Sequence, residues 1–175
     1  IMLPLQGDYQ FENVATYVKA ILLLEKINPH LYEMIGKGIA HVLQNTHLEG
    51  RWQIVQTKPL TICDTGHNED GLKYVIEQIK NTPHKKLRFV LAMVNDKDVN
   101  KVLSMLDKEA EYYLSQAKIP RALPVNELAE KAKQAGLSFT QYETISQALA
   151  KAQEEAEEND LVFVGGSTFT VAEVV

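Results

Sequence analysis

The residues best suited to chemistry lie in one stretch, residues 50–71. An apolar run over residues 60–63 ends at Asp64, and a turn with His67 and Asn68 precedes an amphipathic segment. This pattern predicts a strand that ends at a carboxylate, then a turn and the beginning of a helix. In open α/β sheets, small molecules bind beyond the carboxyl ends of the strands. The stretch is therefore the candidate ligand site of the chain.

The charges in this stretch suit a phosphorylated ligand. Arg51, thirteen residues before Asp64, offers a planar cation that binds phosphate or carboxylate oxygens. The N–H groups at the start of the predicted helix attract the same oxygens. Asp64 could accept sugar hydroxyls, and His67 could reach a phosphate or the reacting centre. Taken singly, Asp64 is also a common turn former, and His67 is commonly a solvated side chain.

Three more loops follow predicted strands and carry polar side chains, at residues 95–98, 119–122 and 166–169. Arg121 could hold a substrate carboxylate through two hydrogen bonds, and a role as a surface residue is equally open. Ser167 could supply a hydroxyl to a ligand, while its alternative role is a tight turn into a helix. Because parallel strands end at one edge of a sheet, all four loops are expected to converge there.

The elements that position these loops alternate between strand and helix. Strands are predicted at residues 52–56, 60–64, 86–93, 110–115, 137–142 and 161–164. Helices are predicted at residues 70–80, 99–106 and 125–135, and in a segment that opens at Thr144. This alternation predicts an α/β fold with a mostly parallel sheet and helices on both faces.

The beginning of the chain has a different pattern. Helices are predicted at residues 10–26 and 31–44, followed by a polar connector at residues 45–49. Two such helices cannot bury their apolar faces alone, so they need a partner from elsewhere. We expect two domains, residues 1–46 and residues 47–175.

Composition narrows the class of protein. The chain has 175 residues, of which 45% are hydrophobic and 23% charged, and its net charge is −5. The negative charge argues against nonspecific nucleic-acid binding, and no apolar run is long enough to span a membrane. The single cysteine, Cys63, excludes a disulfide framework. We expect a cytoplasmic monomer with small-molecule partners and no metal site of its own.

Five motifs in order resemble the Mur ligase superfamily, and within it the branch of folylpolyglutamate synthase and dihydrofolate synthase. They are Gly7-x-x-Gln10-x-x-Asn13, Gly50-Arg51-Trp52 with Asp64 and His67-Asn68, Asp96-Lys97-Asp98, Pro120-Arg121-Ala122, and Gly166-Ser167. The first motif resembles the end of the central ATP-binding domain, and the others resemble the C-terminal domain. Thr65, Gly66, Glu69 and Ala92 depart from the usual residues of the family.

The resemblance implies a Rossmann-like C-terminal domain preceded by the helical end of the central ATP-binding domain. The implied reaction adds glutamate to dihydropteroate or a folate, with ATP and Mg²⁺ bound mainly by the central domain, through an acyl phosphate. Asn13 would contact adenine, Asp64 ribose and Arg51 the phosphates. Arg51 and His67 would be catalytic. His67, Ser167 and Arg121 would bind the substrates.

The phosphate loop of such ligases, Gly-x-x-x-x-Gly-Lys-[Ser/Thr], does not occur in the sequence. We therefore expect a C-terminal fragment that is inactive alone. Two alternatives stay open: a cell-wall Mur ligase that adds an amino acid to a nucleotide-linked peptide, and a catalytically silent Rossmann-like interaction domain. A dinucleotide oxidoreductase is poorly supported, since no Gly-x-Gly-x-x-Gly follows a predicted strand.

Overall fold

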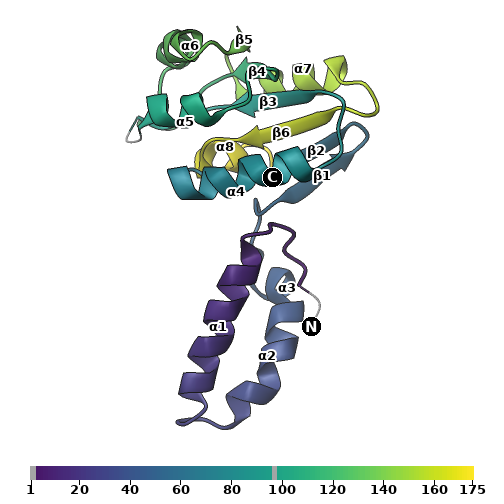
Figure 1. Ribbon diagram of the computed structural model, residues 1–175, viewed down its shortest axis with the longest axis vertical. Coiled ribbons are helices and arrows are strands. Elements are labelled where there is room, and N and C mark those ends of the chain that lie inside the picture. Colours follow the sequence, from purple (N-terminus) through teal and green to yellow (C-terminus); the bar gives the residue numbers. More distant parts are fainter. Residues whose placement is uncertain (1–2, 96–97) are drawn as a thin grey trace.

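The computed structural model describes residues 3–95 and 98–175 of the chain. Asp96 and Lys97, two residues of the candidate loop after the third expected strand, therefore lie outside the described residues. Figure 1 shows the chain in two parts, one built of helices only and one built on a sheet with helices packed on it.

The first part, the helical arm (residues 3–46), is a hairpin of helices that projects from the rest of the molecule (Figure 1). Its helices are α1 (Gln10–Leu24), α2 (His30–Ala40) and α3 (Val42–Thr46). The single helix expected over residues 31–44 is thus divided at His41, whose φ of −108° departs from helical geometry. The His41 ring contacts the carbonyl oxygen of Lys37 at 2.9 Å, an interaction that the periodicity of the sequence does not reveal.

The second part, the α/β unit (residues 50–175), is built on a sheet in the order β1-β2-β6-β3-β4-β5. Its strands are β1 (Gln53–Thr57), β2 (Leu60–Cys63), β3 (Leu87–Leu91), β4 (Glu111–Leu114), β5 (Ser138–Gln141) and β6 (Leu161–Gly165). All neighbouring pairs are parallel except β1 with β2. Only Lys58 and Pro59 separate β1 from β2, and so short a link permits only an antiparallel pair.

Helices cover both faces of the sheet, as Figure 1 shows. The helices of this unit are α4 (Glu69–Asn81), α5 (Val99–Met105), α6 (Val125–Gln134), α7 (Ile145–Glu155) and α8 (Thr168–Ala172). The apolar residues of α4, α5 and α6 join one buried cluster, and those of α7 and α8 join another. The chain crosses over in one direction through β3, β4 and β5 and then returns to β6. Right-handed crossovers place the returning helix α7 on the opposite face.

The periodicity of the sequence explains this packing. On α4 the buried residues Leu72, Val75 and Ile79 recur at helical spacing, and they pack on one face of the sheet. Along β3, every residue from Leu87 to Leu91 is buried, as expected for a central parallel strand covered on both sides. The predicted α/β fold with a mostly parallel, doubly covered sheet is therefore confirmed.

Several predicted boundaries are too wide by one or two residues. Strand β3 is Leu87–Leu91 where residues 86–93 were expected, and β5 is Ser138–Gln141 where residues 137–142 were expected. Flanking apolar residues such as Met93 are buried without pairing in the ladder, so burial extends beyond the hydrogen-bonded strand.

The amino-terminal edge of the sheet holds a buried ionic cluster. The Arg88 Nε donates to Asp160 Oδ2 at 3.1 Å, and its Nη1 donates to the Tyr113 hydroxyl at 2.6 Å and also contacts Glu111. Arg88 and Asp160 are both almost fully buried, and a buried charge requires such partners. This cluster lies at the end of the sheet opposite to the candidate ligand site and serves packing.

Candidate functional site

Asp64 follows β2 directly and is almost completely buried, with 1% of its surface exposed. Its Oδ2 accepts hydrogen bonds from the Trp52 backbone N–H at 2.7 Å and from the Tyr9 hydroxyl at 2.8 Å. Its Oδ1 accepts one from the Gly66 backbone N–H at 2.6 Å. A carboxylate that accepts several hydrogen bonds fixes the chain segments that donate them. Asp64 therefore joins the turn that follows it, the Gly50–Trp52 segment and the helical arm.

Opposing effects act on the pKa of the Asp64 carboxyl group. Burial raises its pKa above the usual value, because the charged form loses water. The hydrogen bonds from Gly66, Tyr9 and Trp52 and the nearby charge of Arg51 oppose this increase. For Tyr9, burial and the adjacent carboxylate raise the pKa of the phenol. Tyr9 is therefore the proton donor in this pair.

The Gly50–Trp52 segment is held against the Asp64 loop on both sides of Arg51. The Gly50 carbonyl accepts from the Thr65 backbone N–H at 2.9 Å, and the Trp52 backbone N–H donates to Asp64. Gly50 has a φ of +71°, and a Cβ on it would lie 2.8 Å from side-chain atoms of both Thr65 and Val171. Only glycine fits this close approach without strain. The motif thus fixes the backbone from which Arg51 projects.

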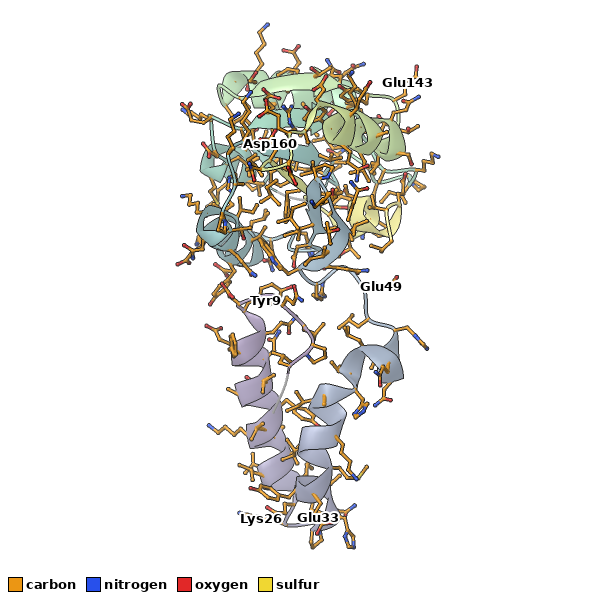
Figure 2. All side chains as sticks on the ribbon, turned by 90° about the vertical axis from the view of Figure 1, so that its right-hand side faces the viewer. Tyr9, Lys26, Glu33, Glu49, Glu143 and Asp160 are labelled. Carbon is orange, nitrogen blue, oxygen red and sulfur yellow. The ribbon has the colours of Figure 1, made fainter. Side chains whose placement is uncertain are left out.

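Arg51 is half-buried and lines a cavity of about 390 Å³ between the arm and the α/β unit. The wall also includes His47 and Glu49 from the connector and Leu5 from the arm. Figure 2 labels Glu49 at this junction. Burial raises the pKa of the Asp64 carboxyl group, and the positive charge of the Arg51 guanidinium is among the effects that oppose this increase. Arg51 and Asp64, which the sequence placed in one site, are therefore neighbours in the fold.

His67 and Asn68 lie on the exposed turn between Asp64 and α4. The His67 Nδ1 lies 2.9 Å from the Thr65 carbonyl oxygen; since a carbonyl only accepts, Nδ1 carries the proton. The Nε2 of a neutral His67 is then left as an acceptor. Asn68 caps α4, because its Oδ1 accepts from the Gly71 N–H at 2.8 Å.

The first turn of α4, whose N–H groups were expected to attract phosphate oxygens, carries acidic side chains. Glu69 and Asp70 occupy this turn, and Glu69 pairs with Lys101 at 2.5 Å and with Lys73 at 2.8 Å. These hydrogen bonds lower the pKa of the Glu69 carboxyl group to about 2. A carboxylate at this end competes with a phosphate for the helix N-terminus. Arg51 is thus the stronger candidate for phosphate contact.

Ser167 lies on the loop after β6 and forms the N-cap of α8. Its Oγ accepts from the backbone N–H groups of Phe169 at 3.0 Å and Thr170 at 3.3 Å, and the residue is only 1% exposed. The preceding Gly166 has a φ of +98°, and a Cβ on it would lie 2.6 Å from the Ala92 carbonyl oxygen. The loop after β6 therefore packs tightly on the loop after β3.

Arg121 is exposed on the loop after β4, and its guanidinium carbon lies 4.8 Å from the centre of the Phe169 ring. The Arg121 carbonyl accepts from the Asn95 backbone N–H at 3.0 Å. Contacts thus run from the β4 loop to α8 and to the β3 loop. The predicted convergence of the strand-ending loops at one edge holds for the residues that the structure describes.

Asn13 is separate from this edge. It is exposed on α1, and its Nδ2 donates to Gln10 Oε1 at 2.9 Å. It borders a cavity of about 230 Å³ inside the helical arm, next to Val14 and Tyr17. The structure therefore groups Arg51, Asp64 and His67 closely, places Ser167 and Arg121 farther along the same edge, and leaves Asn13 on the arm.

Residues that the sequence did not single out connect the arm to α4. Besides the Tyr9 contact, the Asp8 N–H donates to Gln78 Oε1 at 2.9 Å, and Gln78 Nε2 donates to the Gln6 carbonyl at 2.8 Å. The Tyr74 hydroxyl donates to Glu12 at 2.9 Å. These contacts join residues more than sixty positions apart, which no local pattern reveals. In the sequence, these contacts are indicated only by the position of Tyr9 inside the Gly7-x-x-Gln10 motif.

Across residues 3–95 and 98–175, no group of three or more His, Cys, Asp or Glu side chains is arranged to hold a metal ion. The helices in these same ranges include none with the length and apolar character needed to cross a membrane.

Known proteins share this architecture and about a third or less of the aligned residues. A probable bifunctional folylpolyglutamate synthase/dihydropteroate synthase of Haloferax volcanii is 28% identical over 177 residues, covering 99% of this chain and 20% of that protein. The structure of Escherichia coli FolC in complex with DHPP and ADP matches with a TM-score of 0.69 at 30% identity, over 80% of this chain and 32% of that chain.

A bifunctional folylpolyglutamate synthase/dihydrofolate synthase with Mn, AMPPNP and L-glutamate bound matches with a TM-score of 0.66 at 33% identity, over 73% of this chain and 30% of that chain. The chain thus spans 20% to 32% of the length of these three proteins. The family model described as "Mur ligase, glutamate ligase domain" matches residues 50–168, which is most of the chain and includes Arg51, Asp64 and Ser167. The chain belongs to the Mur ligase family and carries its glutamate ligase domain.

Proposed function

We propose that this chain is the C-terminal part of a cytoplasmic, monomeric ligase that uses ATP and Mg²⁺ to join glutamate to dihydropteroate or a folate. Residues 1–46 would be the helical end of its central ATP-binding domain, and residues 47–175 its C-terminal domain. The observation that carries the proposal is that the segment bearing Arg51 is hydrogen-bonded to the Asp64 loop at the carboxyl edge of a glutamate ligase domain. Solved relatives with ADP, AMPPNP, Mn or L-glutamate bound support the same substrates.

In this proposal ATP transfers its γ-phosphoryl group to the substrate carboxylate, which gives an acyl phosphate and ADP. The glutamate amine then attacks the acyl carbon, the C–O bond to phosphate breaks, and the amine loses a proton as the amide forms. Such chemistry depends mainly on positioning and on stabilising negative charge. Mg²⁺ would be held mainly by the central domain.

The candidate residues of this chain form two groups, one on the nucleotide side of the site and one on the glutamate side. On the nucleotide side, Asn13 contacts adenine, Asp64 binds ribose and Arg51 neutralises phosphate charge. The cationic Arg51 fits that task, since it lines a cavity large enough for part of a ligand and its backbone is fixed on both sides. Arg51 is the catalytic residue for which the support is strongest.

On the glutamate side, His67 and Arg121 are the exposed candidates for direct contact. With the Nδ1 proton of His67 donated to Thr65, Nε2 can accept a hydrogen bond from a substrate amine. Arg121 carries a cation suited to a glutamate carboxylate. Because Ser167 is buried and caps α8, we assign its contribution to the shape of the loop that bears on this side.

The complete ligase, meaning the polypeptide that carries this chain together with a phosphate loop, provides the test. It is assayed with ATP, Mg²⁺, glutamate, and either dihydropteroate or a reduced folate, beside a nucleotide-linked peptide as the competing acceptor. We expect glutamate-dependent ADP release with a pteroate or folate acceptor only. Activity solely with the nucleotide-linked peptide would replace the proposal by a cell-wall ligase, and no nucleotide-dependent activity at all would favour a silent interaction domain.

The 175-residue chain alone should release no ADP from ATP under the same conditions, because the sequence has no phosphate loop to hold the γ-phosphate. Turnover by the isolated chain would contradict this part of the proposal.

A further inference from the structure

Tyr9 lies where the helical arm meets the α/β unit, as its label in Figure 2 shows. It immediately precedes α1, and its hydroxyl crosses to Asp64 on the other part, 55 positions along the chain. Its ring lies 6.4 Å from that of Tyr74 on α4. Tyr9 is therefore a partner of the carboxylate to which the proposed function assigns the ribose.

The hydrogen-bonding capacity of Asp64 is almost used up in this arrangement. A carboxylate has about four acceptor positions, two on each oxygen. Trp52 and Tyr9 occupy the two on Oδ2, and Gly66 occupies one on Oδ1. One position is left, whereas a ribose presents two neighbouring hydroxyls.

The donors on Asp64 differ in how readily they can leave. The Trp52 donor is a backbone N–H of the fixed Gly50–Trp52 segment, and the Gly66 donor is a backbone N–H of the Asp64 loop. Tyr9 belongs to the arm, and its hydroxyl is carried by a side chain that can turn away, whereas a backbone N–H moves only with its segment. The neighbouring residues of the arm reach α4 through three hydrogen bonds, two partly buried and one, from Tyr74 to Glu12, exposed. The Tyr9 hydroxyl is thus the donor that can move.

We propose that Tyr9 is a competitor for the ribose: its hydroxyl occupies the Asp64 position that a second ribose hydroxyl needs, so a nucleotide must displace it to bind fully. The 1% exposure of Asp64 agrees with a carboxylate that is covered until this displacement. The inference rests on the proposed function, because it takes Asp64 as the ribose-binding residue.

The proposal has a consequence for nucleotide selectivity. A nucleotide with both ribose hydroxyls exchanges one Tyr9 bond for two ribose bonds and gains about one net bond. A nucleotide without them leaves Tyr9 in place and gains none. Tyr9 therefore reduces the advantage of ATP over 2′,3′-dideoxy-ATP without affecting the binding of the dideoxy compound.

The experiment measures the Kd of the complete ligase for ATP and for 2′,3′-dideoxy-ATP, in the wild type and in the Tyr9→Phe variant. This variant keeps the ring and removes only the hydroxyl. A hydrogen bond to a charged group contributes about tenfold or more to an equilibrium constant. We expect the wild type to prefer ATP about tenfold, and Tyr9→Phe to bind ATP about tenfold more tightly while its affinity for the dideoxy compound stays unchanged.

Tyr74→Phe is the matched control, because it removes a neighbouring tyrosine hydroxyl that also joins the arm to the α/β unit but does not touch Asp64. It should leave both affinities unchanged. Gly7→Ala is a second variant that keeps the hydroxyl: its Cβ would lie 2.6 Å from the Tyr9 ring and must displace that ring. It should shift the ATP affinity in the same direction as Tyr9→Phe.

The outcomes distinguish the assignment of Asp64 to ribose from the competition by Tyr9. If the wild type and Tyr9→Phe both bind ATP and 2′,3′-dideoxy-ATP equally, Asp64 does not bind ribose and the assignment in the proposed function fails. If the wild type prefers ATP and Tyr9→Phe binds ATP equally or more weakly, the ribose assignment stands and the competition is overturned. A preference for ATP that rises in Tyr9→Phe but not in Tyr74→Phe supports the competition.

Discussion

The α/β unit and the helical arm bury their apolar side chains to very different extents. In the α/β unit, Leu128 and Ile145 are completely buried, and the two core clusters fill both faces of the sheet. In the arm, Leu23 near the end of α1 is 60% exposed, and Ile27 in the turn after α1 is 82% exposed. The α/β unit therefore contains its own core, whereas the arm leaves part of its apolar surface in water.

The same contrast applies to what holds the two parts together. Within the α/β unit, apolar contacts and ladder hydrogen bonds dominate, while the arm meets it through side-chain hydrogen bonds at Asp64, Tyr74 and Gln78. Apolar burial contributes much more to stability than a few partly exposed hydrogen bonds. The residues of the proposed nucleotide site are divided across this weaker junction, with Asn13 on one side and Arg51 on the other.

The largest expected effect tests the difference in burial. In the 175-residue chain, Leu128→Ala should lower the free energy of unfolding by about 2–5 kcal/mol, because it leaves a cavity in a closed core. Leu23→Ala is the matched change in the arm and should alter it by less than about 0.5 kcal/mol. Chemical denaturation followed by circular dichroism measures both. Equal losses would mean that the arm is packed as tightly as the α/β unit.

The next effect concerns activity and not stability. In the complete ligase, Arg51→Ala should lower turnover by about 10²–10³-fold, the usual result of losing one electrostatic contact in the transition state. Its melting temperature should stay near that of the wild type, since the backbone bonds of Gly50 and Trp52 remain. Steady-state kinetics and a thermal melt give both values. Near-normal turnover would remove Arg51 from the phosphate side.

Asp64→Ala should lower both the stability of the chain and the affinity of the ligase for ATP. Loss of the carboxylate leaves the Trp52 and Gly66 N–H groups without their acceptor, which should cost about 1–3 kcal/mol of stability in the 175-residue chain. In the complete ligase it should also weaken ATP about tenfold, the net worth of one hydrogen bond to a charged group. Denaturation and a nucleotide titration measure the two losses. A stable variant with wild-type ATP affinity would contradict both roles.

Much of the fold could be predicted because it depends on local periodicity. The apolar spacing on α4 and the wholly apolar β6 point to a helix on a buried parallel strand, and the structure has both. The antiparallel β1 could also have been predicted from the two-residue link to β2, which only a hairpin permits. The division of the second arm helix at His41 could not, because the apolar residues Ile39, Val42 and Leu43 keep helical spacing across it.

The site was predictable to the extent that it lies at strand ends. Asp64 and Ser167 follow adjacent parallel strands, β2 and β6, so topology brings their loops to one edge. What the residues do there depends on contacts that sequence spacing does not encode. The Tyr9 hydroxyl reaches Asp64 from 55 positions away, and the Ser167 hydroxyl faces its own helix.

The smallest effect is expected at Ser167, where the contrast is between a cap that only stabilises and a cap that also shapes the site. Ser167→Ala removes the acceptor of the Phe169 and Thr170 N–H groups, and loss of an N-cap costs about 1 kcal/mol. In the complete ligase the loosened loop should also raise the KM for glutamate, by less than the tenfold expected for ATP in Asp64→Ala, and leave the KM for ATP unchanged.

Thr144→Ala is the matched control for this prediction, because Thr144 caps α7 through the same type of bond, to the Gln147 N–H at 3.1 Å, and follows β5, the last strand in the sheet order. It should lower the melting temperature by a similar amount without changing either KM. Kinetics with glutamate varied at saturating ATP, beside thermal melts of both variants, separate the two effects. If Ser167→Ala behaves like Thr144→Ala in every measurement, the hydroxyl of Ser167 acts only as a helix cap, and the glutamate side consists of His67 and Arg121 alone.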